Sequence, residues 1–157
     1  MGIRAAGTLM LSVSLGVAWS GALPAKDCPP PTKADESAVR QASLDYIEGW
    51  YAGDVVRMTR ALHPELAKRR VFTDPKSGRS VLEQMGAMTL VQKTQKAYGA
   101  ETPKEQQKKD VAVLDICRDA ASVRIDAAGW IDYMHLAKWN GEWKIVNVLW
   151  ESEPEAR

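Results

Sequence analysis

The apolar residues of this chain change their spacing near residue 110, and this change limits the fold more than any other feature. Before that point they recur three and four positions apart, which is typical of amphipathic helices; after it they alternate, which is typical of half-buried strands. Helices followed by a run of strands predict an α+β domain built in layers. We expect three N-terminal helices packed on the concave face of one curved antiparallel sheet, together forming a cone.

The first two helices have clear ends. The first begins after a cap at Thr32 or Asp35 and runs until Gly53 stops it. Asp54 caps the second helix. This helix ends before Pro64, because proline disfavours helical geometry in the residue that precedes it.

A third helix is expected over residues 80–97, after a turn at residues 74–78. Leu82 and Met85 follow the helical spacing in this segment. Gly86 weakens its middle, because glycine loses more backbone freedom in a helix than other residues do.

The alternating half of the chain predicts four strands, over residues 111–117, 122–128, 130–139 and 142–150. Asn140-Gly141 joins the last two, and this dipeptide between alternating runs is the strongest short signal for a hairpin. A two-residue turn fixes the register of the pair. It predicts Trp139 opposite Glu142, Leu136 opposite Ile145, Met134 opposite Asn147 and Asp132 opposite Leu149.

Alternation then assigns the hairpin side chains to two faces. One face carries Trp130, Asp132, Met134, Leu136, Trp143, Ile145, Asn147 and Leu149. The other carries Ile131, Tyr133, His135, Ala137, Val146, Val148 and Trp150. Both faces are apolar, and the helices can cover only one of them. We therefore expect a homodimer through the second face, with Tyr133, His135, Val146 and Val148 at the contact.

Several segments of the chain are similar to those of a known family. The segments His63–Leu66, Gly78–Leu82, Met85–Met88 and Trp130–Trp150 resemble the putative lumazine-binding family of the nuclear transport factor 2-like superfamily. The similarity extends over about residues 36–152. It implies the cone-shaped α+β fold and often a dimer. It implies no activity, because this superfamily includes SnoaL-like cyclases and ketosteroid isomerases as well as binding and interaction domains.

The first face of the hairpin is the better candidate for a ligand pocket. Asp132 and Asn147 are polar groups among large apolar neighbours there, which is the usual composition of a small-molecule site. Aromatic residues on the first helix are further candidates, although such residues at helical spacing also build plain cores. The predicted ligand-binding residues are Tyr46, Trp50, Met88, Trp130 and Asn147.

Asp132 is also the candidate catalytic acid or base, with His63 or Tyr46 as its partner. Ketosteroid isomerases, as distant relatives, likewise place an acidic residue on a late strand inside the cone. Each residue has a structural alternative: Asp132 at a strand start in reach of solvent, and His63 bonded to a nearby carbonyl group. His135 is not a partner in a regular strand, because residues three apart point to opposite faces.

The N-terminal segment predicts an exported protein. Residues 1–22 combine Arg4 with an uncharged, mostly apolar stretch, which is typical of a signal peptide with cleavage near Ala22 or Ala25. Glycine and serine residues interrupt the stretch, which disfavours a stable membrane anchor. A Pro-rich leader over residues 23–35, the domain over 36–152 and a tail over 153–157 complete the organisation.

Export gives the two cysteines a possible pairing. In an oxidising compartment Cys28 and Cys117 form a disulfide; the alternative is two unpaired thiols, one in the leader and one in a strand. Neither cysteine lies beside a histidine or in a C-x-x-C motif. Neither is therefore expected to act as a nucleophile.

Composition narrows the function classes. The 157 residues carry 21 Lys+Arg against 20 Asp+Glu, which gives no general attraction to nucleic acid. Two Cys and two His are too few for common zinc or iron–sulfur sites, and no nucleotide-binding motif occurs, so we expect no metal and no cofactor. The run at residues 68–70 either binds an anion or is solvated surface.

Three functions remain open. The leading one is an exported protein that binds a small organic molecule in a conical apolar pocket. The alternatives are an acid–base enzyme of the cyclase, isomerase or dehydratase type, and a dimeric interaction module without a ligand.

Overall fold

The computed structural model describes residues 28–153 of the chain. Its helices are α1 (Lys33–Ala52), α2 (Val55–Ala61), α3 (Ala87–Gln95) and the short 3₁₀ turns η1 (Tyr98–Glu101) and η2 (Lys104–Gln106). Its strands are β1 (Leu62–Thr73), β2 (Ser80–Gly86), β3 (Lys109–Cys117), β4 (Ala120–Ala127), β5 (Trp130–Trp139) and β6 (Glu142–Ser152).

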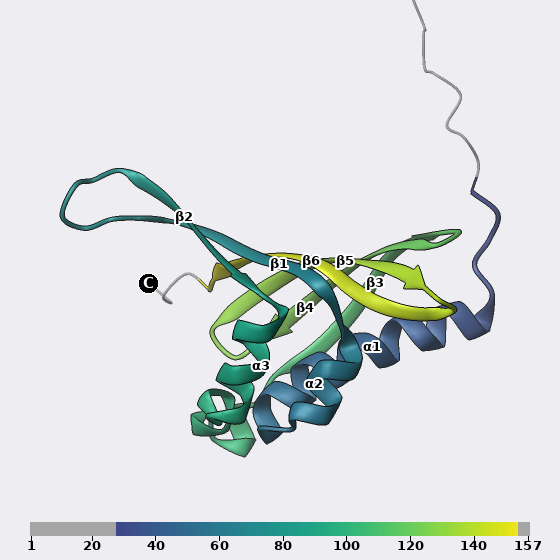
Figure 1. Ribbon diagram of the computed structural model, residues 1–157, viewed down its shortest axis with the longest axis horizontal. Coiled ribbons are helices and arrows are strands. Elements are labelled where there is room, and N and C mark those ends of the chain that lie inside the picture. Colours follow the sequence, from purple (N-terminus) through teal and green to yellow (C-terminus); the bar gives the residue numbers. More distant parts are fainter. Residues whose placement is uncertain (1–27, 154–157) are drawn as a thin grey trace, which may run out of the picture.

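The strands form one curved sheet, and the three α-helices lie together on one of its faces (Figure 1). The order across the sheet is β2-β1-β6-β5-β4-β3. The predicted α+β architecture is confirmed. The sheet is mixed, however, because β1 runs parallel to β6 while the other neighbours are antiparallel. A strand that the sequence analysis did not expect, β1, accounts for this difference.

The ends of α1 follow the predicted caps. The Thr32 side chain accepts a hydrogen bond from the backbone N–H of Asp35, so Thr32 is the N-cap. At the other end Gly53 has φ 66°, a left-handed conformation that glycine adopts without a steric penalty. Asp54 caps α2 as expected. Between these caps, Val39, Tyr46 and Ile47 on the inner face of α1 are buried in the hydrophobic core.

The helix predicted over residues 80–97 is wrong in its first half. Residues 80–86 form strand β2, which pairs with β1 and places Leu82 opposite Val71. The intervening segment at Asp74–Gly78 is the expected turn, and it sends the chain back along β1. Local apolar spacing indicated a helix here, but the long-range pairing with β1 prevails. The β1–β2 hairpin projects beyond the remaining sheet (Figure 1).

The β5–β6 register is correct near the turn and wrong beyond it. Trp139 faces Glu142 and Leu136 faces Ile145, as predicted. The register then shifts by one residue, so that Asp132 faces Trp150 and Met134 faces Val148. Such a bulge leaves one residue unpaired and exchanges the faces of all residues after it.

This bulge reassigns four side chains. Val148 is completely buried and Trp150 lies against the core, although both were predicted on the outer face. Asn147 and Leu149, which were predicted inside, belong to the outer row instead; Leu149 is 50% exposed. Compared with the prediction, the inner face of the sheet therefore carries the Trp150 ring and lacks the Asn147 amide.

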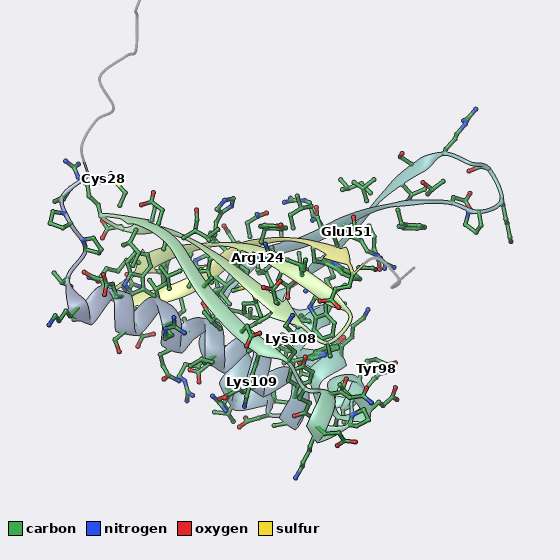
Figure 2. All side chains as sticks on the ribbon, turned by 180° about the vertical axis from the view of Figure 1, so that it is seen from behind. Cys28, Tyr98, Lys108, Lys109, Arg124 and Glu151 are labelled. Atoms are coloured by element: carbon green, nitrogen blue, oxygen red, sulfur yellow. A yellow bond between two sulfur atoms is a disulfide. The ribbon has the colours of Figure 1, made fainter. Side chains whose placement is uncertain are left out.

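The leader is joined to the fold by a disulfide between Cys28 and Cys117. The two Cα atoms are 5.3 Å apart although the residues are 89 positions apart in sequence. Of the two alternatives for the cysteines, the structure has the bonded one. Cys28 lies beside the end of β3, the edge strand of the sheet (Figure 2).

The predicted signal peptide and its cleavage sites lie outside the described residues. Within residues 28–153, no helix combines the length and apolar character needed to cross a membrane.

Candidate functional site

A pocket lies between α1, α3 and the inner face of the sheet, with a cavity volume of about 190 Å³. Aromatic and apolar side chains form most of its wall, and two lysines supply the charged groups. The lining residues are Tyr46 and Trp50 of α1, Lys68 of β1, Met85 of β2, Leu90 and Lys93 of α3, Trp130 of β5 and Trp150 of β6. An apolar wall with few polar groups is the usual composition of a small-molecule site.

Asp132 lies behind this wall and is completely buried. Its Oδ1 accepts a hydrogen bond from Lys68 Nζ at 2.6 Å, and its Oδ2 accepts from the Tyr46 hydroxyl at 3.0 Å. The indole Nε1 of Trp130 donates to the same Oδ2 at 3.0 Å. Three donors from α1, β1 and β5 therefore converge on one carboxylate, as a buried charge requires.

Lys68 connects this network to the pocket. Its Nζ also donates to the Tyr46 hydroxyl oxygen at 2.6 Å and lies 5.3 Å from the centroids of the Tyr46 and Trp150 rings. Burial lowers the pKa of Lys68, and the Asp132 carboxylate opposes that shift. Burial, reinforced by Asp132, raises the pKa of Tyr46 well above its usual value, so the phenol stays protonated and donates.

Each pocket tryptophan is held by a different contact. Trp130 is held by its bond to Asp132, and Trp150 lies with the Arg70 guanidinium 4.5 Å from its ring centroid. Trp50 packs against Gly99 of η1, where an added Cβ would overlap the Trp50 carbonyl oxygen and ring. Glycine at this position allows η1 to pack directly on the tryptophan.

Residues 34–151 match the family described as "Putative lumazine-binding". That match covers well over half of the sequence. The chain belongs to this family. No curated protein matches the chain in sequence.

Several solved structures have a fold similar to that of this protein. An NTF2-like protein of unknown function from Shewanella baltica OS155 superposes with a TM-score of 0.61 and 23% identity, over 80% of this chain and 100% of that one. One from Silicibacter pomeroyi DSS-3 gives a TM-score of 0.57 and 19% identity, over 78% and 100% of the two chains. A protein of unknown function with a cystatin-like fold from Nostoc punctiforme PCC 73102 superposes with a TM-score of 0.53 and 13% identity, over 79% of this chain and 95% of that one.

The structure brings four of the predicted site residues of this family member together. Tyr46, Trp50 and Trp130 line the pocket, and Asp132 lies directly behind them. Asp132 and His135 lie on opposite faces of β5, as the alternation predicted: Asp132 is buried and His135 is exposed.

Three other predicted residues lie elsewhere. Met88 is 68% exposed on α3 and does not line the pocket. Asn147 is on the outer face because of the bulge in β6, where it contacts His135 and Arg69. The predicted place of Asn147 in the pocket is therefore wrong.

His63 is the third, and it lies far from Asp132. Its Nδ1 accepts the backbone N–H of Glu65, and its ring packs edge-on against Trp139 at 4.7 Å between centroids. Trp139 is at the opposite end of β5 from Asp132, roughly 20 Å along an extended strand. The structure thus gives His63 a local structural contact and does not pair it with Asp132.

Lys68 is the missed residue that links the pocket to Asp132. Four other pocket residues were also not predicted from the sequence: Met85, Leu90, Lys93 and Trp150. Lys68 stands in the run Lys68-Arg69-Arg70, which was predicted as an anion site or solvated surface. In β1 the three side chains alternate: Arg69 bonds Gln84 and Asn147 on the outer face, while Lys68 points inward. A strand prediction for residues 68–70 would have placed Lys68 and Arg69 on opposite faces, because side chains alternate along a strand.

Metal binding gains no support from the described residues. Over residues 28–153, no three His, Cys, Asp or Glu side chains come close enough together to hold a metal ion.

Proposed function

We propose that this protein is an exported binding protein for a small, planar organic molecule held in the pocket between α1, α3 and the sheet. The single observation that carries the proposal is the wall itself, in which Trp50, Trp130 and Trp150 surround a mostly apolar cavity. An engineered apolar cavity of about 150 Å³ binds benzene. A volume of about 190 Å³ therefore suits one aromatic ring with a substituent, or a compact two-ring molecule.

Binding is favoured over acid–base catalysis by the state of Asp132. Its side chain is fully buried, and both oxygens already accept hydrogen bonds from the protein. A catalytic acid or base must reach the proton that it transfers. His63 does not lie beside Asp132, and the Tyr46 hydroxyl beside it is already bonded to both Asp132 and Lys68. An interaction module without a ligand has less support, because the interior is not filled by its own side chains.

Tryptophan indole signals offer a direct test. The family's name makes lumazine, a planar two-ring heterocycle, a suitable first probe alongside single-ring aromatics. We expect titration to shift the indole N–H resonances of Trp50, Trp130 and Trp150. Trp139 and Trp143 serve as internal references, because neither lines the pocket. No shift at millimolar probe, or equal shifts at all five, would contradict the proposal.

A pair of variants sharpens this test. Met85→Trp places a large ring in the pocket and should abolish the probe-induced shifts. Met88→Trp introduces the same residue three positions away, on the exposed side of α3, and should leave them unchanged. Loss of binding in both variants would indicate a general disturbance of the fold rather than occupation of the pocket.

Two further parts of the proposal concern compartment and assembly. The Cys28–Cys117 disulfide supports export, because such bonds persist in oxidising compartments. Mass spectrometry of the protein from its own host should find a chain that starts after Ala22 or Ala25. The outer sheet face, where Tyr133 is 45% exposed, supports a homodimer, which light scattering at micromolar concentration should detect.

A further inference from the structure

The side chains that line the pocket carry positive charge without negative charge. Among the side chains that line it, both charged groups are lysine ammonium groups, and none is a carboxylate. Lys68 is neutralised by Asp132 at 2.6 Å, and Arg70, which lies over the Trp150 ring, pairs with Glu83, also at 2.6 Å. Lys93 remains. Over residues 28–153 it forms no ion pair and no side-chain hydrogen bond.

Lys93 is placed to act on an occupant of the pocket. It is half-buried on α3, beside Leu90 in the cavity wall, whereas Lys96 farther along the helix is exposed. It is also close enough to Lys68 for its charge to disfavour the charged form of that residue. Two ammonium groups in an apolar wall repel one another, and an anion between them would relieve that repulsion.

Lys68 has capacity left for such an anion. An ammonium group has three N–H donors, and two of them are used, toward Asp132 and Tyr46. Lys93 has all three. The wall thus combines flat aromatic surfaces with unused cationic donors.

We infer that the natural ligand is an aromatic acid whose ring lies among the three tryptophans and whose anionic group pairs with Lys93. This inference rests on the proposed function and specifies its ligand class. A carboxylate is the simplest such group, and a phenolate or a deprotonated heterocycle presents the same charge to Lys93.

Benzoate and benzamide provide a matched test, because they have nearly the same shape and differ in charge at neutral pH. In low salt, we expect benzoate to bind at least tenfold more tightly than benzamide when both are followed by the pocket indole signals. Raising the ionic strength should weaken benzoate binding and leave benzamide binding nearly unchanged.

Variants assign the effect to one side chain. Lys93→Gln should weaken benzoate binding roughly tenfold and benzamide binding by a much smaller factor. Lys96→Gln, which removes the same charge from the exposed end of α3, should change neither by more than about twofold. Equal affinity for both probes, or a loss of benzoate affinity of the same size in both variants, would overturn the inference while leaving the proposed function intact. If neither probe binds but lumazine does, only the inference fails; if none of the three binds, the proposed function fails as well.

Discussion

Two carboxylates of this protein accept the same set of donors in opposite surroundings. Asp132 accepts from a lysine ammonium, a tryptophan indole and a hydroxyl, those of Lys68, Trp130 and Tyr46. Asp35 accepts from Lys138 Nζ at 2.8 Å, Trp143 Nε1 at 3.1 Å and the Thr32 hydroxyl at 2.7 Å. Asp132 is completely buried behind the pocket, whereas the Asp35 side chain keeps 20% of its exposure at the start of α1.

The contribution of a carboxylate to stability therefore depends on its burial as well as on its hydrogen-bond donors. At Asp35, water screens the charges, and losing a partner costs little because solvent replaces it. At Asp132, no solvent is available, so each partner depends on the others. The buried site fixes the pocket wall, and the surface site ties α1 to the β5–β6 hairpin.

The largest expected effect comes from separating the buried pair. Asp132→Leu leaves the Lys68 ammonium buried without a counter-charge and should lower the free energy of unfolding by about 3–5 kcal/mol. Lys68→Met should have a similar effect by leaving the carboxylate unpaired. Urea denaturation would measure both. The matching change at the surface site, Asp35→Leu, should cost only a small fraction of this.

The double variant Lys68→Met/Asp132→Leu makes the comparison sharper. Removing both charges together should restore most of the stability, because no ion then remains buried. If the double variant is as unstable as the sum of the single ones, the pair is not coupled and burial is not the reason for its importance.

The disulfide provides the next test, because it lies near the surface site. Cys28 is only a few residues before Thr32, so the bond holds the start of α1 close to β3. Replacing both cysteines by serine should lower the free energy of unfolding by about 2–4 kcal/mol, because the unfolded chain gains freedom and the start of α1 loses its covalent link to β3. Amide exchange should increase more around Asp35 than around Asp132. Equal increases at the two sites would mean that the bond stabilises the whole domain evenly.

Gly99→Ala tests the pocket side alone. The added Cβ would meet the backbone and ring of Trp50, so η1 must move away from α1. We expect a loss of about 1–3 kcal/mol and weaker probe binding, with unchanged indole signals for Trp143 beside Asp35. Gly141→Ala is a useful contrast, because its Cβ would meet nothing within 4 Å and only its positive φ is strained. Normal probe binding in Gly99→Ala would show that Trp50 need not be held in place.

Local patterns predicted the caps and turns of the chain better than they predicted the strand pairing that builds the pocket. The Thr32 cap, the Gly53 stop and the Asn140-Gly141 turn are each encoded within a few residues, and all three occur as expected. The pocket depends instead on the bulge in β6 and on the parallel pairing of β1. The bulge interrupts a hairpin register that the turn alone predicts to be regular, and the β1 pairing joins distant segments, with Lys68 opposite Val148. No short window shows this, which is why Asn147 was placed inside and Lys68 was missed.

The smallest expected effect is a pH dependence of stability at Asp35. Hydrogen bonds from Lys138, Thr32 and Trp143 lower the pKa of this carboxyl from 3.8 to about 2. A carboxyl whose pKa is lower in the folded state stabilises the protein only when ionised. Its contribution is therefore complete above about pH 4 and disappears as the pH falls toward about 2. Asp35→Asn should remove this part of the pH dependence, while Glu36→Gln, the adjacent exposed carboxyl, should retain it. Unfolding midpoints measured from pH 7 to pH 2 would show the wild-type and Asp35→Asn curves converging at the acidic end. Parallel curves would mean that the three donors at Asp35 do not favour its ionised form, and the resemblance between the two carboxylates would then be one of geometry only.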